Sequence, residues 1–142
     1  MVMDNEFKRE IILENFEHPF NKDGSDDLNY EKSNSNNESC IDNIDLYVDI
    51  KDNIIRDIRF NGDACAISTA STSIMLKNII NKSVSDAIKY IENFMNMVNE
   101  LDYNEDELNE GIAFTEIYKQ QNRKTCVTLP YVGILKVLKK YL

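Results

Sequence analysis

Apolar and polar residues recur along the chain with periods that predict helices and strands in turn. Residues 4–18 place four apolar side chains on one helical stripe, and Pro19 ends that helix; the four are Phe7, Ile11, Ile12 and Phe16. Residues 44–50 alternate between apolar and polar, which predicts a strand with one buried face. A turn at 51–53 and a second strand at 54–60 complete a predicted antiparallel hairpin that packs on a core.

The segment at about 21–39 is the least structured by this criterion. Asn, Asp, Ser, Lys and Gly dominate it, which is typical of a loop, and we expect this polar loop to be mobile. Structureless connections of this length are usually functional or disordered. Residues 61–63 predict a second turn, because an Asn-Gly-Asp sequence favours one.

Further helices are predicted towards the C-terminus, including a short one at 111–121. One follows Cys65 and is unusually rich in Ser and Thr, and the next begins at Ser83, a favourable N-cap. In the last segment, Pro130 is tolerated only in the first turn of a helix, so we expect that helix to begin close to Cys126.

These elements predict an α+β fold with a small antiparallel sheet of two to three strands and several helices packed on one face. We expect residues 1–142 to form a single domain, because 142 residues match a common domain size of roughly 100–150. Apolar residues make up 42% of the chain, enough for one core.

Charge narrows the range of partners. Sixteen Lys and Arg against 25 Asp and Glu give 16 − 25 = −9, which argues against direct binding of nucleic acid or of an anionic membrane surface. No apolar run of about 18 residues predicts a membrane-spanning helix. The first ten residues are polar and acidic and do not look like a signal peptide. We therefore expect a cytoplasmic protein.

The three cysteines permit two interpretations. Cys40, Cys65 and Cys126 contain no CxxC pair, and they could simply be unrelated buried residues. Alternatively, Cys40 ends the polar loop while Cys65 and Cys126 begin helices, so all three thiols could lie at one end of the domain. The helix dipole would lower the pKa of a thiol at the position of Cys65. With the nearby Asp42, three thiolates and a carboxylate would make a four-ligand set suited to tetrahedral coordination.

Four segments resemble motifs of the U-type iron–sulfur cluster assembly family, which includes SufU, IscU and the N-terminal part of NifU. They are residues 18–24 (HPFNKDG), 40–42 (CID), 62–71 (GDACAISTAS) and 123–129 (RKTCVTL). The third segment is the most specific. Ile41 and Ala64 stand where the family motifs have glycine. The long interval between the second and third cysteines, and the absence of His just before Cys126, are similar to the SufU branch.

The resemblance implies a ligand set and a reaction. Cys40, Asp42, Cys65 and Cys126 match the family's metal ligands, with zinc as the metal in the SufU branch. Cys40 would accept persulfide sulfur from a cysteine desulfurase, and Arg123 would stabilise the thiolates or the persulfide. In the scaffold interpretation the same cysteines hold a transient iron–sulfur cluster for downstream acceptor proteins.

Two alternatives remain open at this stage. The same acceptor chemistry could carry sulfur for tRNA thiolation. In a different class, the chain could be a metal-free interaction domain with structural cysteines. In cluster assembly or in tRNA thiolation, the protein would be a scaffold or a sulfur carrier, similar to a sulfurtransferase, rather than an enzyme that turns over a small molecule.

Overall fold

The computed structural model describes residues 4–23, 29–37 and 42–142. A three-stranded antiparallel sheet in the order β1-β2-β3 comprises β1 (Glu31–Asn36), β2 (Asn43–Lys51) and β3 (Ile54–Asp63). The α-helices of the described chain are α1 (Asn5–Glu17), α2 (Ala66–Ile79), α3 (Val84–Val98) and α4 (Gln121–Leu138). Short 3₁₀ helices add η1 (Glu105–Glu107), η2 (Asn109–Phe114), η3 (Ile117–Lys119) and η4 (Lys139–Tyr141).

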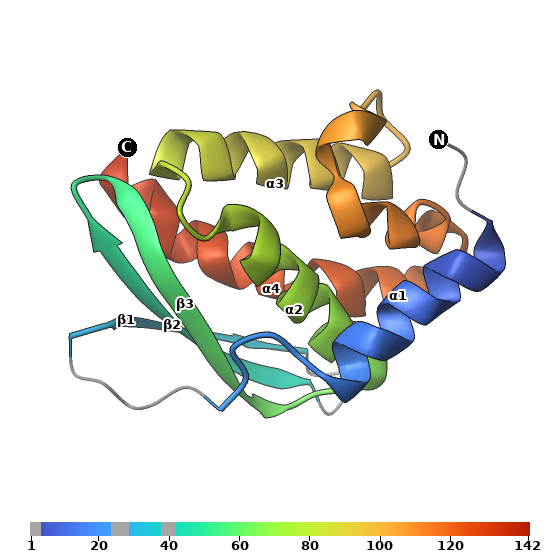
Figure 1. Ribbon diagram of the computed structural model, residues 1–142, viewed down its shortest axis with the longest axis horizontal. Helices are drawn as coiled ribbons and strands as arrows, with labels where there is room; N and C mark the ends of the chain where they lie inside the picture. The colour runs from blue at the N-terminus through green and yellow to red at the C-terminus, as the bar shows by residue number, and fades with distance from the viewer. Residues whose placement is uncertain (1–3, 24–28, 38–41) are drawn as a thin grey trace.

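The helices gather on one face of the sheet, as Figure 1 shows. Helices α2 and α4 pack against the strands and against each other, and α3 packs on these two helices. Buried aliphatic and aromatic side chains from all these layers form one continuous core. The predicted α+β class, with a small antiparallel sheet and helices on one face, is confirmed. Among the described residues, no helix combines the length and the apolar character that crossing a bilayer requires.

The β2–β3 hairpin and the first three helices agree with their sequence patterns. Asp52 and Asn53 turn the chain with φ angles of 55° and 58°, the left-handed conformation that Asp and Asn tolerate best after glycine. Helix α1 ends at its C-cap His18, just before Pro19. Ser83 caps α3 by accepting a hydrogen bond from the Asp86 amide at 3.1 Å.

The predicted turn at 61–63 is wrong, because β3 continues through these residues. Gly62 pairs with Ile44 of β2 and has a φ of 125°. A Cβ atom at this position would lie 2.0 Å from the Asn43 carbonyl oxygen. The glycine therefore permits a close approach of two strands and does not mark a turn.

The predicted mobile loop at 21–39 is wrong over Glu31–Asn36, which form β1 along β2. Alternation failed to reveal this strand because its inward side chains are serines, not apolar residues. Ser33 and Ser35 are buried against α4, where Gly133 leaves room for them. The hydroxyl of Ser33 donates to the Gly133 carbonyl at 2.9 Å. The remainder of the predicted loop at 24–28 and 38–39 lies outside the described residues.

The predicted start of the last helix is also wrong. Helix α4 begins at Gln121, so Cys126 lies in its second turn and Pro130 in its interior. Proline lacks an amide hydrogen, so it cannot bond the carbonyl four residues earlier, which belongs to Cys126. The Ser68 hydroxyl of α2 lies 3.0 Å from that carbonyl oxygen. A polar group therefore lies beside the carbonyl that the interior proline leaves without an amide partner.

Candidate metal centre

Three of the predicted ligands converge in the structure. Asp42, Cys65 and Cys126 each offer one donor atom, and these atoms all lie within 4.8 Å of one another. The residues come from three separate parts of the chain: the position just before β2, the N-cap of α2 and the second turn of α4. Their convergence depends on the packing of α2 against α4 and on the strand that brings Asp42 to the start of α2.

Asp42 is almost fully enclosed, with 1% of its surface exposed. Its Oδ1 accepts a hydrogen bond from the Cys65 amide at 2.7 Å, and its Oδ2 accepts one from the Ser68 hydroxyl at 2.6 Å. Burial alone would raise the pKa of this carboxyl, but the hydrogen bonds from Ser68 and Cys65 outweigh burial and lower it. Asp42 is therefore a carboxylate in the folded protein at neutral pH.

Cys65 caps helix α2, as the sequence predicted. Its Sγ accepts from the Ser68 amide at 3.4 Å, in the place that Ser or Asp occupies at most helix starts. The thiol is free and half-buried. Ala64, just before it, has no positive φ, so the glycine of the family motif is not required there for backbone freedom.

Cys126 is buried, with 8% of its surface exposed, and its thiol is free. The Sγ lies 3.5 Å from the Asn122 carbonyl oxygen, to which the thiol donates one helical turn back. Burial, together with the neighbouring Asp42 carboxylate and Cys65, raises the pKa of Cys126 to about 12. Without a cation beside it, this sulfur keeps its proton.

Ser68 is the residue of the site that sequence reasoning missed. Its hydroxyl is fully buried and lies within hydrogen-bonding distance of Asp42, the Cys126 carbonyl and, at 3.5 Å, the Cys65 sulfur. The signal in the sequence was the density of Ser and Thr in α2. Two more of these hydroxyls bond neighbouring segments: Ser71 bonds the Val127 carbonyl of α4, and Ser73 bonds Asn15 of α1.

Two predicted site residues are not tested by this geometry. Cys40 lies outside the described residues. Arg123 is exposed on α4, one turn before Cys126, and lines a groove of about 490 Å³ with Lys8, Arg9 and Ile67. Within the described part of the chain, no hydrogen bond or ion pair joins Arg123 to the three converging ligands. Its role stays a prediction.

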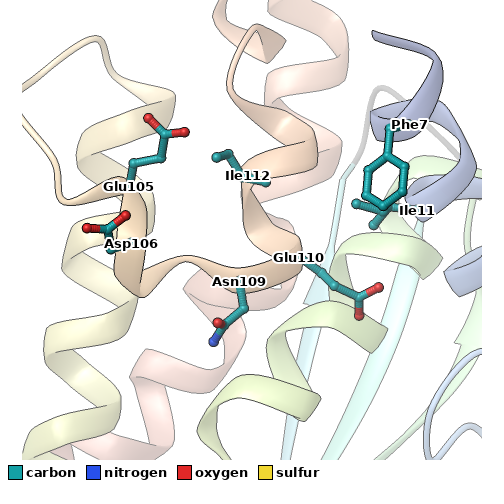
Figure 2. Close-up of a pocket in the computed structure, with 7 residues that line it drawn as sticks. All are labelled: Phe7, Ile11, Glu105, Asp106, Asn109, Glu110 and Ile112. Carbon is teal, nitrogen blue, oxygen red and sulfur yellow. The ribbon is translucent and has the colours of Figure 1, made fainter. Parts of the chain in front are cut away.

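A separate pocket of about 410 Å³ opens between α1 and the η1–η2 segment, as Figure 2 shows. Phe7 and Ile11 form its α1 side, and carboxylates and an amide dominate the opposite side. None of the three converging ligands lines it. The pocket therefore belongs to a different part of the surface from the thiols.

The donor set fits a soft or borderline divalent cation. Two sulfurs and one carboxylate oxygen are ligands that zinc accepts in tetrahedral sites. At Zn–S bonds of about 2.3 Å, tetrahedral sulfurs lie about 3.7 Å apart, so donors within 4.8 Å need only a small inward movement. A cation would also compensate the buried Asp42 charge and take the place of the Cys126 proton. Three described residues supply three of the four positions of such a site.

Comparison with known proteins gives consistent relatives. The family model described as "NifU-like N terminal domain" matches residues 7–127. The iron–sulfur cluster assembly scaffold protein IscU of Thermotoga maritima is 33% identical over 104 residues, which cover 73% of this chain and 73% of the relative. The zinc-dependent sulfurtransferase SufU of Bacillus subtilis is 29% identical over 133 residues, which cover 93% of this chain and 89% of the relative.

Solved structures share the fold over nearly the whole chain. The iron–sulfur cluster assembly scaffold protein for the SUF system from Fervidobacterium islandicum AW-1 superposes with a TM-score of 0.82 at 28% identity, covering 91% of this chain and 94% of the other. The N-terminal part of a NifU-like protein from Brucella abortus gives a TM-score of 0.77 at 16% identity and shows the same fold.

Proposed function

Because the chain belongs to the NifU-like N-terminal domain family, we propose that it is an iron–sulfur cluster assembly protein with a zinc centre that accepts sulfur from a cysteine desulfurase. The observation that carries the proposal is the convergence of Asp42, Cys65 and Cys126 within 4.8 Å of one another. Three residues distant in sequence that meet as a two-sulfur, one-oxygen donor set fit metal binding better than an unrelated scatter of thiols.

The relatives support both parts of this function. One is named a zinc-dependent sulfurtransferase and aligns over 93% of this chain, while another is named a cluster assembly scaffold. We favour the first activity, because the long interval from Cys65 to Cys126 resembles the SufU branch. In the second activity the same sulfurs would hold an iron–sulfur cluster as cargo for downstream acceptor proteins. Free thiols at Cys65 and Cys126 favour a reducing compartment such as the cytoplasm.

We assign Cys40 as the fourth ligand and the sulfur acceptor. It precedes Asp42 by two residues, and two residues of chain span at most about 7 Å. Chain connectivity therefore keeps it within reach of the three donors. Cys65 and Cys126 belong to helices packed on the core and would be the permanent ligands.

The proposed transfer uses thiolate chemistry. Bound zinc would hold the cysteines as thiolates at neutral pH and protect them from oxidation. The Cys40 sulfur, once released, attacks the outer sulfur of the donor's persulfide: a new S–S bond forms to Cys40, the donor's own S–S bond breaks, and its cysteine leaves as a thiolate. The exposed Arg123 guanidinium would stabilise the negative charge of the thiolate or of the new persulfide.

The test couples metal content to desulfurase activity. Purified wild-type protein is expected to hold one zinc per chain, and Cys65→Ala and Cys126→Ala variants are expected to lose it. With a cognate cysteine desulfurase, wild-type protein should increase the rate of alanine formation from cysteine. Cys40→Ala should abolish this stimulation, and mass spectrometry should find the added sulfur on Cys40 of the wild type.

Each failure has a distinct meaning. Wild-type protein that binds no metal after careful purification contradicts the zinc centre and favours the metal-free interaction domain. A Cys40→Ala variant that stimulates the desulfurase as well as the wild type does contradicts the acceptor assignment. As a control, a Cys40→Ser variant that fails to stimulate the desulfurase, as Cys40→Ala does, would show that the thiol itself is required and not merely the residue's volume.

A further inference from the structure

The Ser68 hydroxyl has more acceptors than it can serve at one time. Its Oγ lies 2.6 Å from Asp42 Oδ2, 3.0 Å from the Cys126 carbonyl oxygen and 3.5 Å from the Cys65 sulfur. A serine hydroxyl carries a single hydrogen. Since the residue is fully buried, water cannot easily replace a lost partner. The single hydrogen can serve only one of the two oxygen acceptors, and the charged carboxylate at 2.6 Å is the stronger of the two. The third neighbour, the Cys65 thiol, is itself a donor to the Ser68 oxygen.

The second acceptor exists because of a break in α4. A helical carbonyl normally accepts from the amide four residues later, but for Cys126 that residue is Pro130, which has no amide hydrogen. The Cys126 carbonyl is thus without its helical partner and faces Ser68 across the α2–α4 contact. The Ser68 hydroxyl, which bonds Asp42, therefore has the Cys126 carbonyl beside it as an alternative acceptor.

We propose that Ser68 is a positioning residue that holds Asp42 in the orientation for metal binding. The Cys126 carbonyl is the alternative acceptor of the Ser68 hydroxyl when the Asp42 carboxylate moves. The Cys65 amide fixes one carboxylate oxygen and Ser68 fixes the other, each through one lone pair. Each oxygen keeps a second lone pair for a cation. When Asp42 Oδ2 turns away from Ser68, the hydroxyl can bond the Cys126 carbonyl instead, so the Ser68 donor is not left unpaired.

This inference deepens the proposed metal centre and rests on it. It gives Asp42 a fixed orientation at the proposed metal centre, where Cys40 is the ligand that sulfur transfer releases. Groups that orient a metal ligand through a hydrogen bond commonly change metal affinity by 10–100-fold when they are removed. Ser68 would act through Asp42 and not by binding the metal itself.

Ser71 supplies a matched control. It lies one turn further along α2, is also fully buried, and its hydroxyl donates to the Val127 carbonyl of α4 at 2.6 Å. Ser71→Ala therefore deletes the same atom from the same helix and breaks the same kind of contact to α4. In contrast to the Ser68 hydroxyl, the Ser71 hydroxyl bonds none of Asp42, Cys65 and Cys126.

The experiment measures zinc affinity by competition with a chromophoric chelator for the full-length wild type, Ser68→Ala and Ser71→Ala. Ser68→Ala should weaken binding by roughly 10–100-fold and Ser71→Ala by less than about threefold. The same two substitutions are then made in an Asp42→Ala background. There Ser68→Ala should cause less than about a threefold further loss, because the ligand that it positions is gone. Substituting Co²⁺ for zinc should shift the visible absorption bands in Ser68→Ala but not in Ser71→Ala.

Urea unfolding of the metal-free proteins provides a second measurement that does not depend on metal. The destabilisation caused by Ser68→Ala should be larger with Asp42 present than in the Asp42→Ala background, whereas that caused by Ser71→Ala should be the same in both. A Ser68→Ala protein that folds only without Asp42 would show the same coupling.

The proposal is overturned if Ser68→Ala leaves zinc affinity unchanged or increases it, or if its effect persists undiminished without Asp42. It is also overturned if Ser71→Ala has an equal effect, which would make both serines merely structural. These outcomes differ from failure of the proposed function, in which the wild type itself binds no zinc.

Discussion

Asp42 and Cys126 share one buried site but differ in what surrounds their ionisable atoms. Asp42 receives hydrogen bonds from the Cys65 amide and the Ser68 hydroxyl, so its negative charge is compensated despite burial. Cys126 faces a carbonyl oxygen and a carboxylate, both of which disfavour a thiolate. The same pocket therefore keeps the acid charged and this thiol neutral until a cation arrives.

The raised pKa of Cys126 predicts slow alkylation. At pH 8, a thiol with a pKa of about 12 is a thiolate in roughly one molecule in 10⁴. We expect iodoacetamide to modify Cys126 of the metal-free folded protein much more slowly than the half-buried Cys65, as read by peptide mass spectrometry. In urea the two rates should converge. Equal rates in the folded protein would contradict the described environment of Cys126.

The lowered pKa of Asp42 predicts a pH-dependent contribution to stability. A carboxyl whose folded pKa lies below its unfolded value stabilises the fold above the unfolded value, about 3.9, and loses that contribution as pH falls through the folded pKa. The metal-free wild type should therefore be more stable than Asp42→Asn at pH 7, and the difference should shrink below about pH 4. Urea unfolding at pH 7 and pH 3 measures it. A difference that is constant with pH would contradict the prediction.

At the scale of elements, β1 and α4 are joined by an unusually close contact. A Cβ atom added to Gly133 would lie 2.2 Å from the Ser35 hydroxyl oxygen and 3.1 Å from Leu46 Cδ1. The glycine brings the helix near enough for Ser33 to bond its carbonyl. The buried serines of β1 therefore pack against α4 at Gly133, where the helix has no side chain.

Gly133→Ala should destabilise the protein by about 1–3 kcal/mol, because the added methyl group forces β1 away from α4. Ser35→Ala alone should be close to neutral, since among the described residues the Ser35 hydroxyl has no hydrogen-bond partner. Combining the two should recover part of the loss, because the nearest clashing atom is gone. Denaturant unfolding gives all three values. If the two changes in unfolding free energy simply add, the contact with Ser35 is not the cause of the destabilisation by Gly133→Ala.

These elements also show which features the sequence could predict. Strict alternation identified β2, and the N-cap residue Ser83 identified α3, because both signals depend on local geometry. Strand β1 was not predicted because its buried residues are serines, which pack against a glycine about a hundred residues later in the chain. The start of α4 was not predicted because the polar group beside the carbonyl that Pro130 leaves without an amide partner, the Ser68 hydroxyl, lies on α2. In both cases the decisive partner is distant in sequence.

The site was predictable to a similar extent. Motif resemblance identified Asp42, Cys65 and Cys126, and the structure brings them together. Neither resemblance nor spacing identified Ser68, because its importance comes from the two oxygen acceptors and the Cys65 thiol that tertiary packing places around its hydroxyl. Cys40 and Arg123 stay predictions from the sequence.

For the whole molecule, a bound metal would link three distant parts of the chain. Residue 42 precedes the central strand, residue 65 begins one core helix and residue 126 belongs to another. An ion shared by these segments would close loops of 23 and 61 residues, counted as 65 − 42 and 126 − 65. Because the unfolded chain lacks the assembled site, the free energy of metal binding would add to the stability of the fold.

Removal of metal should therefore lower the melting temperature. Zinc at a hundredfold excess over its dissociation constant would stabilise the protein by about 2.7 kcal/mol, which corresponds to several degrees for a domain of this size. Calorimetry before and after dialysis against a chelator measures the shift, and added zinc should restore it. Cys126→Ala should show no response to zinc. An identical melting temperature with and without zinc would contradict a metal held by the folded state.

The fold is sensitive to substitution at Gly62, although this residue supplies no ligand atom to the proposed metal centre. Its backbone conformation is open only to glycine, and the atom that a methyl group would strike is the carbonyl oxygen of Asn43, the neighbour of Asp42. A random-mutagenesis screen for loss of function should thus recover position 62 together with the ligands, although a residue with no side chain takes no part in the chemistry.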